Sequence, residues 1–258
     1  MTEYDGFRLE RDETRGVATI TLDVPGKLNR VSMTARGQLA AVFAELGRDE
    51  AVRVVVITGE GGTFTAGGDI AGFLEVSPEG MSGLAFNVAA PERCPKPVIA
   101  KLRGYAFGVG LELALACDFR IAADDVELGL PEIKLGMMPG SGGSQRLARL
   151  VGLGRAKDMV LRGRRIRADE ALSIGLVTEI VPPDELDGAV DSLIDELLAL
   201  SPLALAMAKR ALNTAYEGPL HLGLEIEGLA HGILRSTQDY KEGIDAFYAK
   251  RPPRFEGR

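Results

Sequence analysis

The chain has 258 residues, of which 46% are hydrophobic, so it can bury one substantial core. Lys and Arg total 30 against 37 Asp and Glu, and the net charge of −7 argues against nucleic-acid binding through bulk positive charge. The N-terminus is polar and acidic, and no apolar run approaches the roughly 20 residues that cross a bilayer, so we expect neither a secretory signal nor a membrane partner. The two cysteines are isolated, which predicts no disulfide framework. Together these features predict a cytoplasmic protein.

The first predicted elements are a strand, a helix and a second strand. Residues 17–22 alternate between apolar residues and threonine, which predicts a strand with one buried face. Ser32 is suited to cap a helix, because an apolar stripe at helical spacing follows it. That stripe consists of Leu39, Val42, Phe43 and Leu46. Residues 52–58 form a β-branched run, typical of a strand buried on both faces.

Strand and helix continue to alternate up to about residue 150. Residues 98–102 and 119–122 predict strands, and residues 109–117 between them predict a helix. This alternation is typical of an α/β unit.

The pattern changes near residue 185, after which only helices are predicted. An apolar stripe follows that point, and three further helical segments are expected over residues 202–216, 221–236 and 238–249. We therefore expect an α/β core with the active site over residues 1–185 and a helical C-terminal region over residues 186–258.

Several kinds of site are excluded by the motifs. The only histidines, His221 and His231, are ten residues apart, which does not place them on one face of a helix as a metal pair would require. Gly108-Val-Gly110 begins like a dinucleotide fingerprint, but Leu113 replaces its third glycine. The glycines from position 140 to 143 lack the Gly-Lys of a phosphate-binding loop. No metal or nicotinamide motif is therefore expected.

Glu112 is the only charged residue between positions 109 and 117. A helix that is apolar on every side is buried, and an unpaired carboxylate inside it costs several kcal/mol. Two interpretations follow from the residues alone. The carboxylate either forms a buried ion pair with Arg103 or Arg120, or it acts as a catalytic acid or base.

A second carboxylate and two glycine junctions complete the candidate site. Glu132 follows a proline, and is either an ordinary exposed loop carboxylate or a second catalytic group. Gly67-Gly68 and Gly108-Val-Gly110 each stand between a predicted strand and a helix, where free backbone N–H groups can point at an anion. Two such donors facing one oxygen would form an oxyanion hole, and the alternative is a pair of tight turns.

These motifs resemble the crotonase superfamily, most closely the enoyl-CoA hydratases. The resemblance rests on Thr63-Phe-Thr-Ala-Gly-Gly-Asp-Ile70, Leu130-Pro-Glu-Ile-Lys-Leu-Gly136 and the segments 96–100, 104–118 and 138–147, in this order and spacing. It runs from about residue 6 to the end of the chain. It implies an α/β fold, a spiral of repeated β-β-α turns, with a helical C-terminal region that builds trimers, commonly paired into hexamers.

The resemblance also implies an activity: water adds across the C2=C3 bond of a trans-2-enoyl-CoA and gives a 3-hydroxyacyl-CoA. Coenzyme A is then part of the substrate, and no metal or redox cofactor is expected. Two alternatives stay open. One is another crotonase reaction, such as double-bond isomerisation or hydration of a cyclic or aromatic acyl-CoA. The other is a non-catalytic protein that binds acyl-CoA or serves as a scaffold.

Roles for individual residues are implied in the same way. The N–H groups of Gly68 and Val109 would bind the thioester oxygen, although Val109 replaces a glycine that is usual at this position. Glu112 and Glu132 would match the two catalytic glutamates of the hydratases. Gly140 would match the glycine whose N–H helps to seat the attacking water.

Coenzyme A is expected to contact a further group of residues. The carbonyl of Ala66 would accept the adenine amino group. Phe247 and Lys250 would lie near the coenzyme A phosphates, including those of a neighbouring subunit. The other expected contacts are Lys27, Leu28, Asp69 and Ile70. Segment 71–91 would lie beside the acyl pocket, while Lys101 and Arg103 depart from the usual hydratase residues and have no assigned role.

Overall fold

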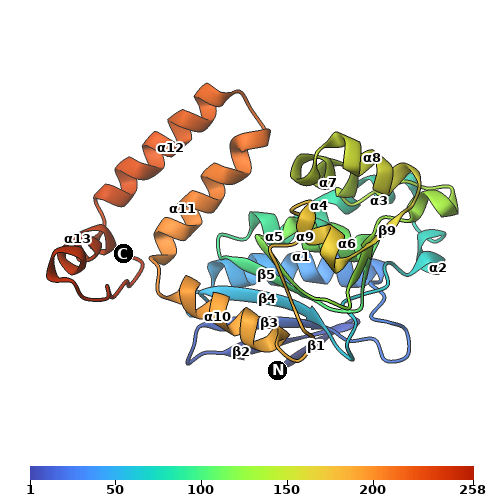
Figure 1. The fold of residues 1–258 in the computed structure, drawn as a ribbon, viewed down its shortest axis with the longest axis horizontal. Helices are drawn as coiled ribbons and strands as arrows, with labels where there is room; N and C mark the ends of the chain where they lie inside the picture. Colours follow the sequence, from blue (N-terminus) through green and yellow to red (C-terminus); the bar gives the residue numbers. More distant parts are fainter.

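The computed structural model describes residues 1–258, with the side chain of Tyr216 left out. Its centre is a seven-stranded sheet of order β1-β2-β3-β4-β5-β7-β10, parallel from β3 onward and antiparallel at the N-terminal edge (Figure 1). Its strands are β1 (Thr2–Tyr4), β2 (Phe7–Asp12), β3 (Val17–Leu22), β4 (Val54–Gly59), β5 (Val98–Leu102), β7 (Phe119–Ala123) and β10 (Glu179–Val181).

A smaller sheet of order β6-β8-β9 lies beside the larger one and carries the residues around the candidate site. Its strands are β6 (Tyr105–Phe107), β8 (Glu127–Gly129) and β9 (Arg165–Arg167). The helices up to residue 173 are α1 (Met33–Arg48), α2 (Ile70–Phe73), α3 (Pro78–Ser82), α4 (Leu84–Val88), α5 (Ala90–Arg93), α6 (Val109–Ala116), η1 (Glu132–Leu135), α7 (Gly143–Val151), α8 (Leu153–Leu161) and α9 (Ala168–Ser173).

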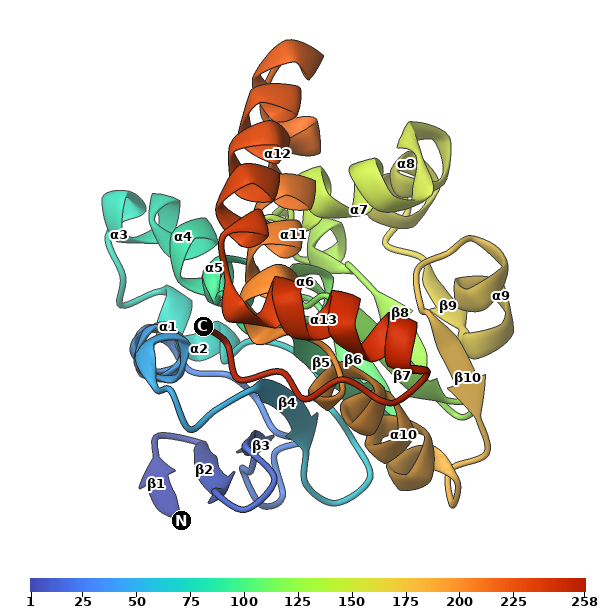
Figure 2. The ribbon, with the colours of Figure 1, turned by 90° about the vertical axis from the view of Figure 1, so that its left-hand side faces the viewer.

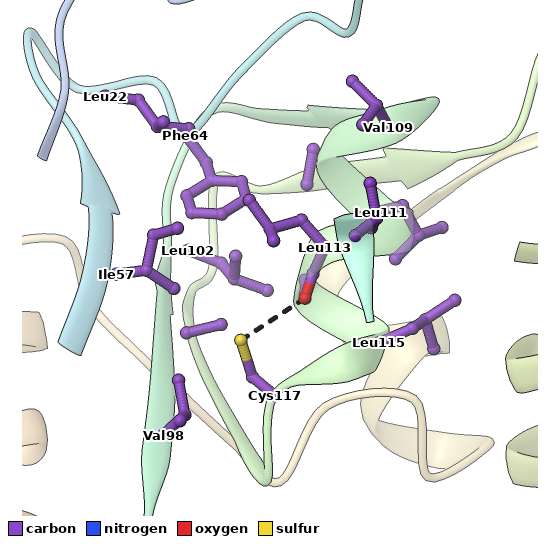
Figure 3. Packing of buried hydrophobic residues seen from close by; sticks show 14 of the residues in the cluster. Leu22, Ile57, Phe64, Val98, Leu102, Val109, Leu111, Leu113, Leu115 and Cys117 are labelled. Carbon is purple, nitrogen blue, oxygen red and sulfur yellow. Dashed lines mark hydrogen bonds between the residues drawn. The ribbon is translucent and has the colours of Figure 1, made fainter. Parts of the chain in front are cut away.

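Side-chain alternation in the strands covers both faces of the main sheet. In β4, Val55 and Ile57 join the cluster that includes α1 and α6, whereas Val54 and Val56 join the cluster beneath α10 (Leu186–Leu198). The strand is therefore buried on both faces, as its β-branched run predicts. Figure 3 shows Leu113 of α6 directed toward Phe64, at the centre of the first cluster.

The α/β organisation predicted from the sequence is confirmed. Strands β3 and β5 have the predicted bounds, and β4 begins two residues later than expected. Helix α1 begins after Ser32, whose hydroxyl accepts a hydrogen bond from the N–H of Ala35 at 2.9 Å. Its predicted stripe is buried throughout.

The C-terminal region is helical, as predicted. It contains α11 (Pro202–Asn213), η2 (Thr214–Tyr216), α12 (Leu220–Arg235) and α13 (Gln238–Ala249). Figures 1 and 2 show α11 and α12 side by side, projecting away from both sheets. The boundary between residues 185 and 186 stays a prediction. Within the described part of the chain, no helix combines the length and apolarity that crossing a membrane requires.

Backbone hydrogen bonds join β6 to the segment that follows β4. The N–H of Thr65 donates to the carbonyl of Tyr105 at 2.8 Å, and the N–H of Phe107 donates back to Thr65 at 3.2 Å. Gly110 in the first turn of α6 lies against this segment, because a Cβ there would stand 2.4 Å from Cγ2 of Thr65. Only glycine allows α6 to begin this close to residues 65–68.

We predict that Gly110→Ala destabilises the fold by about 1–3 kcal/mol through overpacking, although alanine is the better helix former. Thr65→Ser removes the clashing methyl group and keeps the hydroxyl that accepts a hydrogen bond from the N–H of Gly67. The double variant should therefore recover stability in urea unfolding. Gly188→Ala is the matched control, since a Cβ there meets nothing within 4 Å. Equal effects of the two glycine substitutions would contradict the packing account.

Candidate active site

A cavity of about 120 Å³ opens where segment 66–68, α2 and the following short helices, the start of α6, η1 and segment 137–141 meet. Its apolar wall is formed by Ile70, Phe73, Met81, Leu84, Phe107, Leu135, Met137 and Met138. Its charged and hydroxyl-bearing residues are Arg36, Glu112, Glu132 and Ser141. Segment 71–91 contributes Phe73, Met81 and Leu84 to this wall, and its position beside an acyl pocket stays a prediction.

Glu112 is 2% exposed and lies in α6, every residue of which is buried. Its Oε1 accepts hydrogen bonds from the N–H of Ser141 at 2.7 Å and the N–H of Gly143 at 2.9 Å. These two donors fix the direction in which the carboxyl group points. Position 143 requires glycine for this contact, because a Cβ there would stand 2.9 Å from Cγ of Glu112.

The ion-pair interpretation of Glu112 is wrong for both arginines. Arg103 pairs with Asp125 at 3.1 Å, and Arg120 donates to backbone carbonyls, including that of Cys117 at 2.7 Å. Lys101, the other residue without an assigned role, pairs with Asp187. These cations have structural partners elsewhere, and among the described residues the hydrogen bonds to the Glu112 carboxyl group come from backbone N–H groups.

Glu132 begins η1 and faces the same cavity. Its Oε1 would stand 3.1 Å from a Cβ at Gly108, a residue with a φ of +53°, so the carboxylate rests on a position that suits only glycine. Its Oε2 is buried and has no hydrogen-bond partner among the described residues. Burial raises the pKa of Glu132 to about 7, the charge of Glu112 adds to this rise, and that of Arg36 opposes it. The exposed-loop interpretation is therefore wrong.

The two expected oxyanion donors both belong to the cavity wall. Gly68 follows the strained Gly67, whose φ is +117°, and Val109 is the first residue of α6. Within the described bonds, neither N–H donates to a protein acceptor. Val109 is not among the residues with positive φ, so its side chain does not strain the junction.

The remaining predicted contacts divide into two groups. Ala66, Ile70 and Gly140 line the cavity. Leu28 lies beside Ala66, whose N–H donates to the Leu28 carbonyl at 2.9 Å, which places the segment around Lys27 at this side of the site. Asp69 caps α2 and lies 3.8 Å from Arg30. The contacts of these residues with coenzyme A stay predictions.

Phe247 and Lys250 do not line the cavity of their own protomer. Phe247 is 77% exposed on α13, which Figures 1 and 2 place at the end of the C-terminal helices, away from the short helices around the cavity. His221 and His231 are exposed on α12, and the described residues hold no cluster suited to a metal ion.

Sequence reasoning missed Arg36 and Ser141. Arg36 is 3% exposed, and its Nη1 donates to Oγ of Ser141 at 3.0 Å. The sequence does contain a sign of Arg36, because position 36 precedes Leu39 and Phe43 by three and seven residues and so lies on the apolar face of α1. Charged residues are rarely buried without a partner, so an arginine on this face indicates a functional or structural role.

Comparison with known proteins shows the family to which the chain belongs. A family model described as enoyl-CoA hydratase/isomerase matches residues 12–258. The short-chain-enoyl-CoA hydratase of Clostridium acetobutylicum is 37% identical over 91% of this chain and 92% of its own length. The crotonyl-CoA hydratase of Syntrophomonas wolfei is 38% identical over 98% of both chains.

The fold agrees as well. A crystal structure of enoyl-CoA hydratase from Bacillus anthracis superposes with a TM-score of 0.92 at 36% identity, covering 98% of this chain and 100% of that one. This match confirms the crotonase-like α/β fold that the sequence motifs imply.

The raised pKa of Glu132 predicts how stability depends on pH. The ordinary pKa of 4.5 applies to the unfolded chain and the value of about 7 to the folded one, so the folded state holds this proton longer. The contribution is fully present below pH 4.5, declines as the pH rises, and is lost above about pH 7. Glu132→Gln should abolish this decline.

Urea unfolding of both proteins across this pH range isolates the effect, because every other titrating group is common to the two. The difference in unfolding free energy should move in favour of the glutamine variant as the pH rises. Parallel pH profiles would show that Glu132 is not held in a proton-retaining environment.

Proposed function

The chain belongs to the enoyl-CoA hydratase/isomerase family, and from this premise we propose that it adds water across the C2=C3 bond of a trans-2-enoyl-CoA to give a 3-hydroxyacyl-CoA. It is a lyase, and its substrate is an acyl-CoA thioester. The observation that carries this proposal is the pair Glu112 and Glu132, two carboxylates from different elements that line one small, largely apolar cavity.

The two carboxylates differ in a way that suits the reaction. Glu112 is fixed in direction by two N–H donors, so as the general base it can orient water and accept its proton. Glu132 titrates at about pH 7, so near neutrality a large fraction of it carries a proton that it can deliver to C2. The water oxygen bonds to C3 as the C2=C3 π electrons move toward the thioester, and C2 then takes the proton.

The N–H groups of Gly68 and Val109 would stabilise the charge that develops on the thioester oxygen. Donors positioned at such an oxygen act most strongly in an enclosed, apolar site, and one donor is typically worth about 10²- to 10³-fold in rate. Gly140 lies beside Ser141 at the Glu112 side of the cavity, where its N–H can help to seat the water. These groups suffice for hydration without a metal or redox cofactor.

Glu112→Gln and Glu132→Gln should each reduce hydration of crotonyl-CoA by roughly 10²- to 10⁴-fold, the usual contribution of a general acid or base. Binding of the thioester should largely persist, because the oxyanion donors remain. The double variant should be little slower than the poorer single variant, since residues that act as a unit are not additive. Loss of absorbance at the enoyl thioester band measures the rates.

Two results would decide against this assignment. A folded Glu112→Gln protein that hydrates crotonyl-CoA at nearly the wild-type rate would overturn the paired mechanism. If hydration were lost but a 3-enoyl-CoA were still converted to its 2-enoyl isomer, Glu132 alone would be moving the proton, and isomerisation would become the better description of the activity.

The C-terminal helices support a proposal about assembly. No residue of α11 or α12 is fully buried within the protomer, although Lys209 of α11 pairs with Asp118 of the core. Yet α12 exposes large apolar side chains on two sides, namely Leu220, Leu222, Leu224, Leu229 and Ile233. Such a surface is typical of subunit contacts. We propose a homotrimer or a pair of trimers, in which Phe247 and Lys250 reach the coenzyme A of a neighbouring subunit.

Light scattering should therefore give three or six times the protomer mass of 27.5 kDa. Leu224→Glu should dissociate the assembly and raise KM for crotonyl-CoA, because contacts made by a neighbour are lost. Leu172→Glu is the control, since Leu172 lies on α9, outside the C-terminal helices, and is 40% exposed. A wild-type monomer with full activity would contradict the assembly. An unchanged KM in Lys250→Ala would contradict the phosphate contact.

A further inference from the structure

Arg36 is a buried cation without an ion pair. It is 3% exposed, and within the described part of the chain no carboxylate lies within 4.0 Å of its guanidinium. Its Nε is buried and unpartnered among the described atoms. An arginine stays charged in proteins, and burying that charge is expensive unless something nearby compensates it. The reason for its place must lie in the cavity that it lines.

The Arg36 guanidinium contacts Ser141, next to Glu112, and Gly68, an expected oxyanion donor. Its Nη1 donates to Oγ of Ser141 at 3.0 Å, and the N–H of that same residue donates to Oε1 of Glu112 at 2.7 Å. Its Nη2 lies against Gly68, where a Cβ would come within 2.8 Å. Its Cζ stands 5.3 Å from the centre of the Phe73 ring, which closes the remaining side. One group thus contacts the loop that holds Glu112 and the residue expected to bind the thioester oxygen.

Two ionisable groups face Arg36, and both are the candidate catalytic glutamates. Glu112 approaches from α6 and Glu132 from η1, and both charges favour the protonated guanidinium, whose pKa burial alone would lower. The nearest elements contribute no other charge toward it. Arg165 stacks on the Phe107 ring at 4.3 Å, and Arg30 lies near the exposed Asp69.

We propose that Arg36 is a positioning residue that serves as the shared counter-ion of the two glutamates and, through Ser141, fixes the loop that holds Glu112. This proposal rests on the proposed hydratase function. The fixed positive charge of Arg36 limits how firmly Glu132 holds its proton. Its hydrogen bond to Ser141 fixes the loop whose N–H groups donate to Glu112.

Arg36→Met should affect both stability and activity. Removing one partner of buried, mutually compensating charges is destabilising, because the remaining charge is left uncompensated. Arg36→Met should therefore lower the unfolding free energy, whereas Arg36→Lys keeps the charge and should largely retain it. In the folded Arg36→Met protein, turnover should also fall by roughly tenfold or more, the usual effect of losing a charged hydrogen-bonding partner.

The pH profile of kcat/KM for crotonyl-CoA is the decisive readout. The alkaline limb reports deprotonation of Glu132, whose pKa of about 7 is held down by Arg36. In Arg36→Met and Arg36→Gln this limb should move upward by roughly one pH unit. Arg36→Lys keeps the charge and should keep the limb in place. Ser141→Ala keeps the charge but loses the hydrogen bond, so its rate should fall while its limb stays.

Arg53→Met is the matched control, because Arg53 is also partly buried, donates to the carbonyls of Leu198 and Leu200, and lies outside the cavity. It should leave the profile unchanged. The proposal is overturned if the limb of Arg36→Met coincides with that of the wild type. It is also overturned if the loss of rate appears only with acyl chains that end in a carboxylate, which would make Arg36 a substrate-binding residue.

A different result would reject the proposed function: the wild-type protein itself would not hydrate enoyl-CoA thioesters, and no pH profile could be compared. A wild-type enzyme that hydrates crotonyl-CoA but is indifferent to the charge at position 36 would reject this inference alone.

Discussion

The site depends on a carboxylate that is buried without a cationic partner in contact. Glu112 lies inside an apolar helix, and the N–H groups of Ser141 and Gly143 are its hydrogen-bond donors. Backbone donors cannot be displaced by solvent or swing away, so the carboxylate has a fixed direction. This geometry requires α6 to start against residues 65–68 and α7 to start beside Glu112, and glycine at positions 110 and 143 permits both approaches.

Burial in this cavity also explains how two glutamates can have different catalytic roles. Glu132 has a buried oxygen without a partner among the described atoms, so its neutral form is favoured, whereas Oε1 of Glu112 accepts hydrogen bonds from two backbone N–H groups. Environments that separate the protonation of two carboxyl groups are a common basis for assigning an acid and a base. Arg36 links the two, because its charge acts on both and its side chain contacts the loop around one of them.

Much of this could be predicted from the sequence, and the exceptions have physical causes. Periodicity found β3, β5 and α1, because each is long enough to repeat an apolar pattern. It missed β6, β8 and β9, which have three residues each and are set by tertiary pairing, and the three short helices α3, α4 and α5. The start of α2 was expected from the glycines at positions 67 and 68. Motifs found Glu112 and Glu132. Which partner held Glu112 could not be deduced, because Ser141 and Gly143 act through backbone N–H groups that carry no residue signature.

The central claim is that two carboxylates deliver the elements of water from one side of a flat alkene. Hydration of crotonyl-CoA in D₂O tests it directly, because the product then carries deuterium at C2 and the new oxygen at C3. Proton NMR coupling between these centres gives their relative configuration. The account predicts one diastereomer, with deuterium and hydroxyl added to the same face. Addition to opposite faces, or a mixture of both products, would contradict it.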